Sequence, residues 1–155
     1  MKFAGSKAKK HIQSKDNNRT VMNQKRQILL VEDIESTIDI VATQLECLGY
    51  EVAIARNGLE ALGKLAEHAP DLIIMDIQLP QMGGFEAVGH IRGNPQFRDI
   101  PILAATAKAL KGDEEMCLAA GCDGYIAKPF THRQLETAIS AVFQRKAEHR
   151  QAEER

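Results

Sequence analysis

The chain has 155 residues, 44% of them hydrophobic, and this is enough to bury one hydrophobic core but not two. No stretch approaches the roughly 20 apolar residues of a membrane-spanning helix, and the N-terminus has no apolar signal segment. We therefore expect a cytoplasmic protein without a membrane span. The cysteines are odd in number and lack paired metal spacing, which indicates reduced thiols rather than a disulfide or zinc framework. They are Cys47, Cys117 and Cys122.

The net charge of −1 conceals an asymmetry along the chain. Residues 1–27 contain eight Lys or Arg and one Asp, a net charge of +7, which leaves −8 for the remainder. We predict that residues 1–26 form a disordered basic leader, because polar residues separate the charges and almost nothing is available to bury. Such a segment could contact nucleic acid or an acidic membrane, but a leader without a binding role has the same composition.

From residue 28 onward, short apolar runs alternate with segments of helical period. A strand is predicted over 28–31, followed by a helix over about 35–48 that Gly49 ends. The apolar face of this helix consists of Ile38, Val41, Leu45 and Leu48. A second strand covers 51–55, and Asn57-Gly58 then leads into another helix. The predicted buried face of that helix carries Leu59, Leu62 and Leu65.

The second half of the chain repeats the alternation. The strand 71–75 is closed by Asp76, and the strand 102–105 ends in Thr106. The helix between them, 84–92, has Phe85, Val88 and Ile91 at helical spacing. A less amphipathic helix over about 112–120 and a short strand over 124–127 follow. The last helix is predicted to be capped by Thr131 and to bury Leu135, Ala138, Ile139 and Val142.

Five strands and five helices in strict alternation predict an α/β fold, a doubly wound parallel sheet with helices on both faces. In such folds ligands bind beyond the carboxyl ends of the strands. Charged side chains follow several of those ends: Glu32, Asp33, Asp76 and Lys128. Three acids and one lysine suit a hard divalent cation and phosphoryl chemistry on an aspartate. Any one of these acids alone is equally compatible with a solvated loop residue.

The motifs that carry these residues resemble those of the receiver domain of two-component response regulators. The likeness spans about 27–143 and places the domain at 27–145, followed by a charged C-terminal tail over 146–155. The matching segments are 30–33, 71–84, 100–107 and 124–130, in the order and at the spacing of the family. The resemblance implies a flavodoxin-like sheet with strand order 2-1-3-4-5, an order known for chemotaxis members of the family and not shown by the spacing.

The resemblance also implies roles for individual residues. Asp76 would accept phosphate from a histidine kinase or a histidine phosphotransfer protein, so the protein is a phosphoacceptor that assists its own phosphorylation and dephosphorylation rather than an enzyme with a separate substrate. Asp33, Asp76 and the backbone carbonyl of Gln78 would bind Mg²⁺ directly, and Glu32 would reach it through water. Many family members have Asp at the position of Glu32, whose extra methylene shifts the carboxylate by about one bond length.

The implied switch comprises Thr106, Tyr125 and Lys128. Lys128 and the hydroxyl of Thr106 would bind phosphoryl oxygens, and Tyr125 would move inward with Thr106. Without phosphate, Lys128 would form a salt bridge with Asp76, and a cis peptide before Pro129 would direct Lys128 to the site. Gln78 and Lys108 would tune the lifetime of the phosphate. The output surface would be the fourth helix, fifth strand and fifth helix, in a monomer or a phosphorylation-dependent dimer.

Two other classes of protein fit the sequence less well than a receiver domain does. A flavodoxin-like FMN carrier needs a phosphate-binding first loop, which Glu32 and Asp33 would repel. A phosphatase of the haloacid dehalogenase type needs a second Asp two residues after its nucleophile, where Gln78 cannot transfer protons. A receiver domain excised from a hybrid histidine kinase stays open. Because no DNA-binding domain follows, a stand-alone regulator would act on a downstream protein target.

Overall fold

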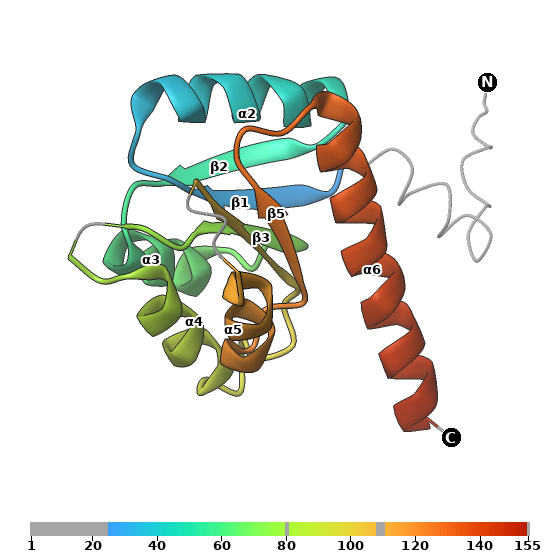
Figure 1. The fold of residues 1–155 in the computed structure, drawn as a ribbon. Helices are drawn as coiled ribbons and strands as arrows, with labels where there is room; N and C mark the ends of the chain where they lie inside the picture. Colours follow the sequence, from blue (N-terminus) through green and yellow to red (C-terminus); the bar gives the residue numbers. More distant parts are fainter. Residues whose placement is uncertain (1–24, 80, 108–110, 155) are drawn as a thin grey trace, which may run out of the picture.

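The computed structural model describes residues 25–79, 81–107 and 111–154 (Figure 1). Within these ranges five strands alternate with five helices in chain order, as the sequence predicts. The elements are β1 (Gln27–Val31), α2 (Glu35–Cys47), β2 (Glu51–Ala55), α3 (Gly58–Glu67), β3 (Leu72–Asp76), α4 (Gly84–Arg92), β4 (Ile102–Thr106), α5 (Asp113–Ala120), β5 (Gly124–Ala127) and α6 (His132–Glu154). Most of the predicted leader 1–26, together with Lys108, lies outside the described residues.

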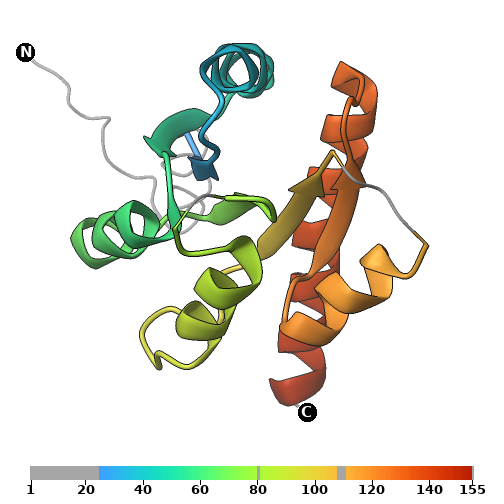
Figure 2. The ribbon, with the colours of Figure 1, turned by 60° about the vertical axis from the view of Figure 1, so that its left-hand side comes forward.

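The strands form one parallel sheet in the order β2-β1-β3-β4-β5, which confirms the expected fold and strand order. Helices α2 and α6 cover one face of the sheet, and α3, α4 and α5 cover the other (Figure 2). Because all the strands run the same way, their carboxyl ends meet along one edge of the sheet. The loops that leave this edge carry the predicted site.

Burial on both faces explains why the central strands are continuously apolar. Every residue of β3 and β4 is buried, whereas the edge strand β2 is largely exposed or half-buried. One hydrophobic cluster lies between the sheet and α3, α4 and α5, and includes Leu65, Ile91 and Cys117. A second cluster lies between the sheet and α2 and α6, and includes Leu45 and Ile139.

Helix α3 departs from the predicted buried face at one position, since Leu65 is buried and Leu62 is partly buried as expected but Leu59 is not. Leu59 is 59% exposed, whereas Ala61 and Leu65 are fully or almost fully buried. The helix begins at Asn57, whose side chain accepts a hydrogen bond from the backbone N–H of Glu60 at 2.8 Å. Gly58, Ala61 and Leu65 follow at helical spacing and form the buried face, and Leu59 lies outside it.

Helix α6 begins as predicted but extends further. The Thr131 hydroxyl accepts from the backbone N–H of Gln134 at 3.0 Å, and the Gln134 side chain accepts from the backbone N–H of Thr131 at 2.8 Å. The helix then continues to Glu154, so the predicted charged tail 146–155 is helical over its described part. Residues 144–154 are rich in Ala, Glu, Arg, Lys and Gln, which favour helix, and no Gly or Pro interrupts them.

The N-terminal end of the sheet is held together by the side chain of Arg92, at the end of α4. Its guanidinium donates to the carbonyls of Gly121, Arg98 and Ile100 at 2.7–2.8 Å. It also donates to the Asp123 carboxylate at 2.8 Å. A planar group with five donors suits this role because it can bind several oxygens at once. Arg92 therefore joins α4, the turn after α5 and the segment before β4.

Asp123 connects this network to α6. Its carboxylate also accepts from the backbone N–H of Ile102 at 2.9 Å and lies 3.5 Å from the Lys146 ammonium. Arg145 donates to the Asp123 carbonyl at 2.7 Å. The extension of α6 is therefore attached to the start of β5 by two side chains on its own surface.

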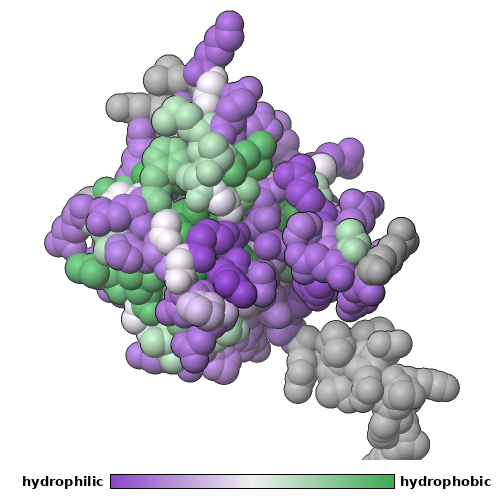
Figure 3. Space-filling model, turned by 90° about the horizontal axis from the view of Figure 1, so that it is seen from below, coloured by the Kyte–Doolittle hydropathy of each residue, from purple (hydrophilic) through white to green (hydrophobic). Residues whose placement is uncertain are grey.

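The surface seen from the side of α4 and α5 is mostly hydrophilic, with separate hydrophobic patches (Figure 3). Met116 and Leu118 of α5 are 56% and 40% exposed. None of the described helices is long and apolar enough to cross a membrane. All three cysteines are free thiols, with Cys47 exposed and Cys117 and Cys122 buried.

Candidate phosphoacceptor and metal site

Register brings the predicted site residues together at the carboxyl edge of the sheet. Val31 pairs with Met75, so the residues that follow β1 lie beside Asp76 at the end of β3. On the other side, Asp76 pairs with Ala105, and Thr106 pairs with Ala127. Glu32, Asp33, Asp76, Thr106 and Lys128 thus follow or close four strands, of which β3 is central.

Three carboxylates form a compact cluster at this edge. Glu32, Asp33 and Asp76 each offer an oxygen, and these oxygens lie within 4.8 Å of one another. Glu32 and Asp76 are only 2% and 5% exposed, whereas Asp33 is exposed. Carboxylate oxygens are the ligands that Mg²⁺ prefers, and an exposed member leaves room for the waters that Mg²⁺ retains. The donor set therefore fits a hard divalent cation.

The crowding of these carboxylates and their burial change the pKa of Asp76. Burial is the main reason that its pKa rises from 3.8 to about 6, and the nearby Glu32 raises it further. A hydrogen bond from the backbone N–H of Gln78 to Asp76 Oδ1, at 3.0 Å, and the charge of Lys128 act in the opposite direction. A cation beside Asp76 would favour the ionised carboxylate that a nucleophile requires.

Lys128 contacts two of the carboxylates. The predicted ion pair with Asp76 is present, with 3.7 Å between Nζ and Oδ2. Glu32, however, is the closer partner, and its Oε1 accepts a hydrogen bond from the Lys128 ammonium. The other oxygen of Glu32 accepts from the backbone N–H groups of Asp33 and Ile34 at 3.1 and 3.2 Å. The peptide bond between Lys128 and Pro129 is cis, as predicted.

The two predicted switch residues lie on neighbouring strands. Thr106 is 3% exposed at the end of β4, and the backbone N–H of Lys128 donates to its carbonyl at 2.8 Å. Tyr125 pairs with Ala104 and is half-buried against the cluster beneath α3, α4 and α5. The loops that carry Thr106 and Lys128 are therefore directly connected, while Tyr125 lies at the opposite end of β5.

Gly84 is a site residue that sequence reasoning did not single out. A Cβ at this position would lie 2.6 Å from both the Asp76 carbonyl oxygen and the Ile77 Cα, so no side chain fits without a shift of the backbone. The Gly84 N–H donates to the Ile77 carbonyl at 3.1 Å, which closes the loop after β3. Two consecutive glycines at the start of a helix were the available signal, since close backbone approach requires Gly.

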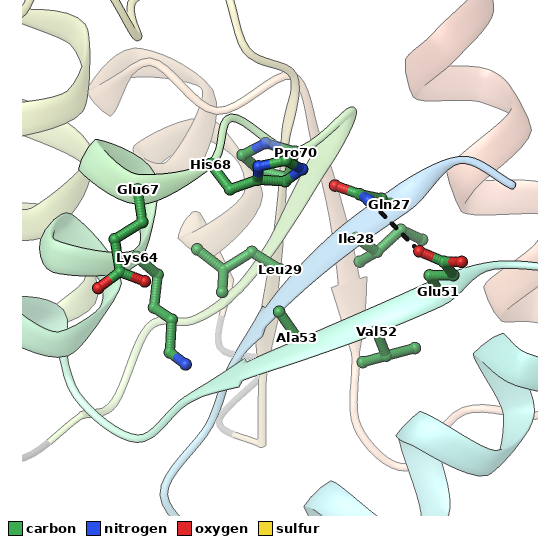
Figure 4. A pocket seen from close by; sticks show the side chains of 10 residues that line it. All are labelled: Gln27, Ile28, Leu29, Glu51, Val52, Ala53, Lys64, Glu67, His68 and Pro70. Atoms are coloured by element: carbon green, nitrogen blue, oxygen red, sulfur yellow. Dashed lines mark hydrogen bonds between the residues drawn. The ribbon is translucent and has the colours of Figure 1, made fainter. Parts of the chain in front are cut away.

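Another hollow, of about 250 Å³, lies at the N-terminal end of β1 and β2 (Figure 4). Apolar and small side chains such as Leu29 and Ala53 form part of its lining, and Lys64, Glu67 and His68 approach it from the end of α3. It contains no cluster of acids comparable to the one around Asp76. The chemistry is therefore concentrated at the carboxyl edge of the sheet.

Comparison with known proteins agrees with the geometry. The family model described as response regulator receiver domain matches residues 28–140. The chain therefore belongs to the receiver domain family of two-component signalling, a family of phosphoacceptor signalling domains.

Among curated relatives, the polar-differentiation response regulator DivK of Brucella anthropi is 44% identical over 116 residues, covering 74% of this chain and 94% of the relative. Among solved structures, the receiver domain of the sensor histidine kinase PA1611 from Pseudomonas aeruginosa, with a magnesium ion in its active site cleft, has a TM-score of 0.69 and 38% identity over 74% of this chain and 93% of that one. The chemotaxis protein CheY4 of Vibrio cholerae has a TM-score of 0.72 and 34% identity over 77% and 99%.

Proposed function

We propose that Asp76 accepts a phosphoryl group from a phosphohistidine of a histidine kinase or a histidine phosphotransfer protein. An Asp76 carboxylate oxygen forms a bond to phosphorus as the phosphorus–nitrogen bond of the histidine breaks. The observation that supports this most directly is the placement of Asp76, a buried strand-end carboxylate within 4.8 Å of two other acids and 3.7 Å from Lys128. Asp76 closes a central strand and lies next to both the other acids and the ammonium of Lys128.

Asp33, Asp76 and the backbone carbonyl of Gln78 would hold Mg²⁺, with Glu32 acting through water. When bound, Mg²⁺ neutralises charge on the transferring phosphoryl group. Support comes from the donor set of this chain and from the magnesium ion in the cleft of the 38% identical receiver domain. Lys128 and the Thr106 hydroxyl would bind the phosphoryl oxygens that remain.

A groove beside the site offers a surface for the phosphodonor protein. It has a volume of about 440 Å³ and lies between α2 and the segment after β5. Its lining includes Ile34, Ile40, Phe130 and Lys128, and the first two are more than half exposed. Exposed aliphatic side chains next to a reactive carboxylate fit a protein donor better than a small molecule.

The output would be a change on the surface formed by α5, β5 and α6. Phosphate adds charge and acceptor oxygens next to Thr106 and Lys128, and so favours an arrangement in which Tyr125 moves inward. The exposed side chains of Met116 and Leu118 lie on α5. The DivK relative is covered over 94% of its length by this domain, which favours a regulator that acts through protein contacts.

Phosphorylation by acetyl phosphate with Mg²⁺ tests the nucleophile. Mass spectrometry should show one added phosphate that is lost in alkali, because an acyl phosphate is labile to base and a phosphoserine ester is not. The phosphate should be absent in Asp76→Asn and present in Asp71→Asn, which changes an exposed acid at the other end of the same strand. Alkali-labile phosphate on Asp76→Asn would refute the assignment.

The switch is tested by NMR with beryllofluoride, which mimics the phosphoryl group. Thr106→Ala should still bind beryllofluoride at Asp76 but show much smaller shifts around Tyr125 than the wild type. Equal shifts near Tyr125 in both proteins would rule out coupling through Thr106.

A further inference from the structure

Lys128 is held by Glu32 rather than by the proposed nucleophile. Its ammonium donates to Glu32 Oε1 and is 3.7 Å from Asp76 Oδ2, the longer of the two contacts. Both members of the nearer pair are well covered, with side-chain exposures of 15% for Lys128 and 2% for Glu32. A buried ammonium requires an anionic partner, and in the described structure that partner is chiefly Glu32.

Glu32 is a fixed partner. Its Oε2 accepts hydrogen bonds from the backbone N–H groups of Asp33 and Ile34, so the carboxylate is anchored to the loop after β1. Oε1 is then directed to Lys128 across the carboxyl edge of the sheet. A side chain constrained at one oxygen in this way has few rotamers left for the other.

The choice of Glu rather than Asp matters for this contact. An Asp at position 32 could still accept from the two backbone N–H groups, because short acidic side chains commonly bond the backbone one or two residues ahead. Its carboxylate would, however, end about 1.5 Å short of the position that Glu reaches. Charge and loop geometry would be preserved while the contact to Lys128 would be lost.

We propose that Glu32 is a positioning residue that keeps the Lys128 ammonium beyond hydrogen-bond distance of Asp76 until phosphoryl oxygens arrive. While Lys128 donates to Glu32, it makes only the 3.7 Å ion-pair contact with Asp76 Oδ2, and Oδ1 accepts from the N–H of Gln78. A phosphoryl group carries more charge than one carboxylate and offers three acceptor oxygens, so it competes successfully for the ammonium. This inference rests on the proposed function, because it assigns a resting partner to the lysine of that same site.

The lysine ammonium signals of the full-length protein provide the test. Wild type, Glu32→Asp and Asp76→Asn are labelled with nitrogen-15, and the Lys128 Nζ signal is assigned by its loss in Lys128→Arg. In the absence of Mg²⁺, Glu32→Asp should displace or broaden this signal beyond detection, and Asp76→Asn should shift it only slightly. A larger effect of Asp76→Asn than of Glu32→Asp would overturn the proposal and make Asp76 the resting partner.

Affinity for beryllofluoride at saturating Mg²⁺ gives a second readout. If Lys128 is free of Glu32 in only about a tenth to a third of molecules, releasing it in Glu32→Asp should tighten binding by about three- to tenfold. Unchanged or weaker binding would contradict the holding role. If wild type binds no beryllofluoride at all, the proposed function itself fails, whatever the Lys128 signal shows.

Discussion

The two ends of the parallel sheet differ in how their charged side chains are balanced. At the N-terminal end, the Asp123 carboxylate accepts hydrogen bonds from Arg92 and from the Ile102 N–H, and Lys146 lies 3.5 Å away. At the carboxyl end, three acids lie together and Lys128 is the ammonium paired with two of them. A balanced cluster is complete without a ligand, whereas an acid-rich one gains stability when a cation or a modification arrives.

Removing the centre of the balanced end should have the largest effect. Arg92→Ala removes the side-chain donor to three carbonyls and one of the two closest donors to the Asp123 carboxylate, and should lower the free energy of unfolding by about 2–4 kcal/mol. Urea denaturation measures the change. Arg98→Ala removes an exposed side chain in the same region and should change stability by less than about 0.5 kcal/mol. Similar losses in both variants would show that Arg92 is not the organising group.

Removing a negative charge at the acid-rich end should raise the free energy of unfolding. Because the pKa of Asp76 is raised from 3.8 to about 6, the folded protein binds this proton more tightly than the unfolded chain does. The stability that the proton provides is present below about pH 4 and is lost as pH rises through about 6. Without metal, Asp76→Asn should therefore be more stable than wild type by roughly 2–3 kcal/mol at pH 7.

The pH dependence of the stability difference between Asp76→Asn and wild type distinguishes an effect of ionisation from an effect of packing. Denaturation of both proteins in a chelator, from pH 4 to pH 8, should show the advantage of Asp76→Asn shrinking toward pH 4. An advantage of the same size at both ends of the range would mean that ionisation of Asp76 is not its cause.

Mg²⁺ should stabilise the wild type through the same end of the sheet. At ten times its dissociation constant a ligand adds about 1.4 kcal/mol, which thermal denaturation detects as a higher midpoint. Asp33→Asn should abolish this response and Glu32→Gln should only weaken it. Lys146→Ala, at the N-terminal end, should leave it intact. An unchanged midpoint for wild type with Mg²⁺ at neutral pH would argue against a metal site.

The smallest expected effect is that of Lys146→Ala on stability itself. Its ammonium is 3.5 Å from a carboxylate that already has two closer donors. The loss should be about 0.5 kcal/mol, and it should diminish in high salt because part of it is electrostatic. A loss above about 2 kcal/mol would show that the α6 extension, and not Arg92 alone, holds this end together.

The sequence predicts one end of the sheet far better than the other. Glu32, Asp33, Asp76 and Lys128 were predictable because each directly follows or closes an apolar strand, and parallel strands bring such positions to one edge. Arg92 and Asp123 are separated by a strand, a helix and their connecting loops, and no local pattern links a helix-terminal arginine to a residue before a strand.

The ion-pair partner of Lys128 was harder to predict from the sequence than the location of the site. The sequence placed Lys128 near the acids, but the preference for Glu32 over Asp76 depends on side-chain reach and on the two backbone donors that fix Glu32. The exposure of Leu59 shows the same limit, because packing against the sheet, and not periodicity alone, decides which apolar positions of α3 are buried. The helical continuation beyond residue 143 agrees with propensity, since all residues from 144 to 154 except His149 favour helix.

The length of α6 gives it the properties of a lever. At 1.5 Å per residue its 23 residues span about 35 Å, and the part beyond Lys146 extends about 12 Å past the point where Asp123 holds it. If α6 tilts slightly about its contact with Asp123, the displacement grows with distance from that contact. A rotation that moves β5 very little therefore moves Glu154 further. A spin label or fluorophore at the C-terminal end of α6 should therefore report movements of the receiver domain that are too small to detect at the sheet.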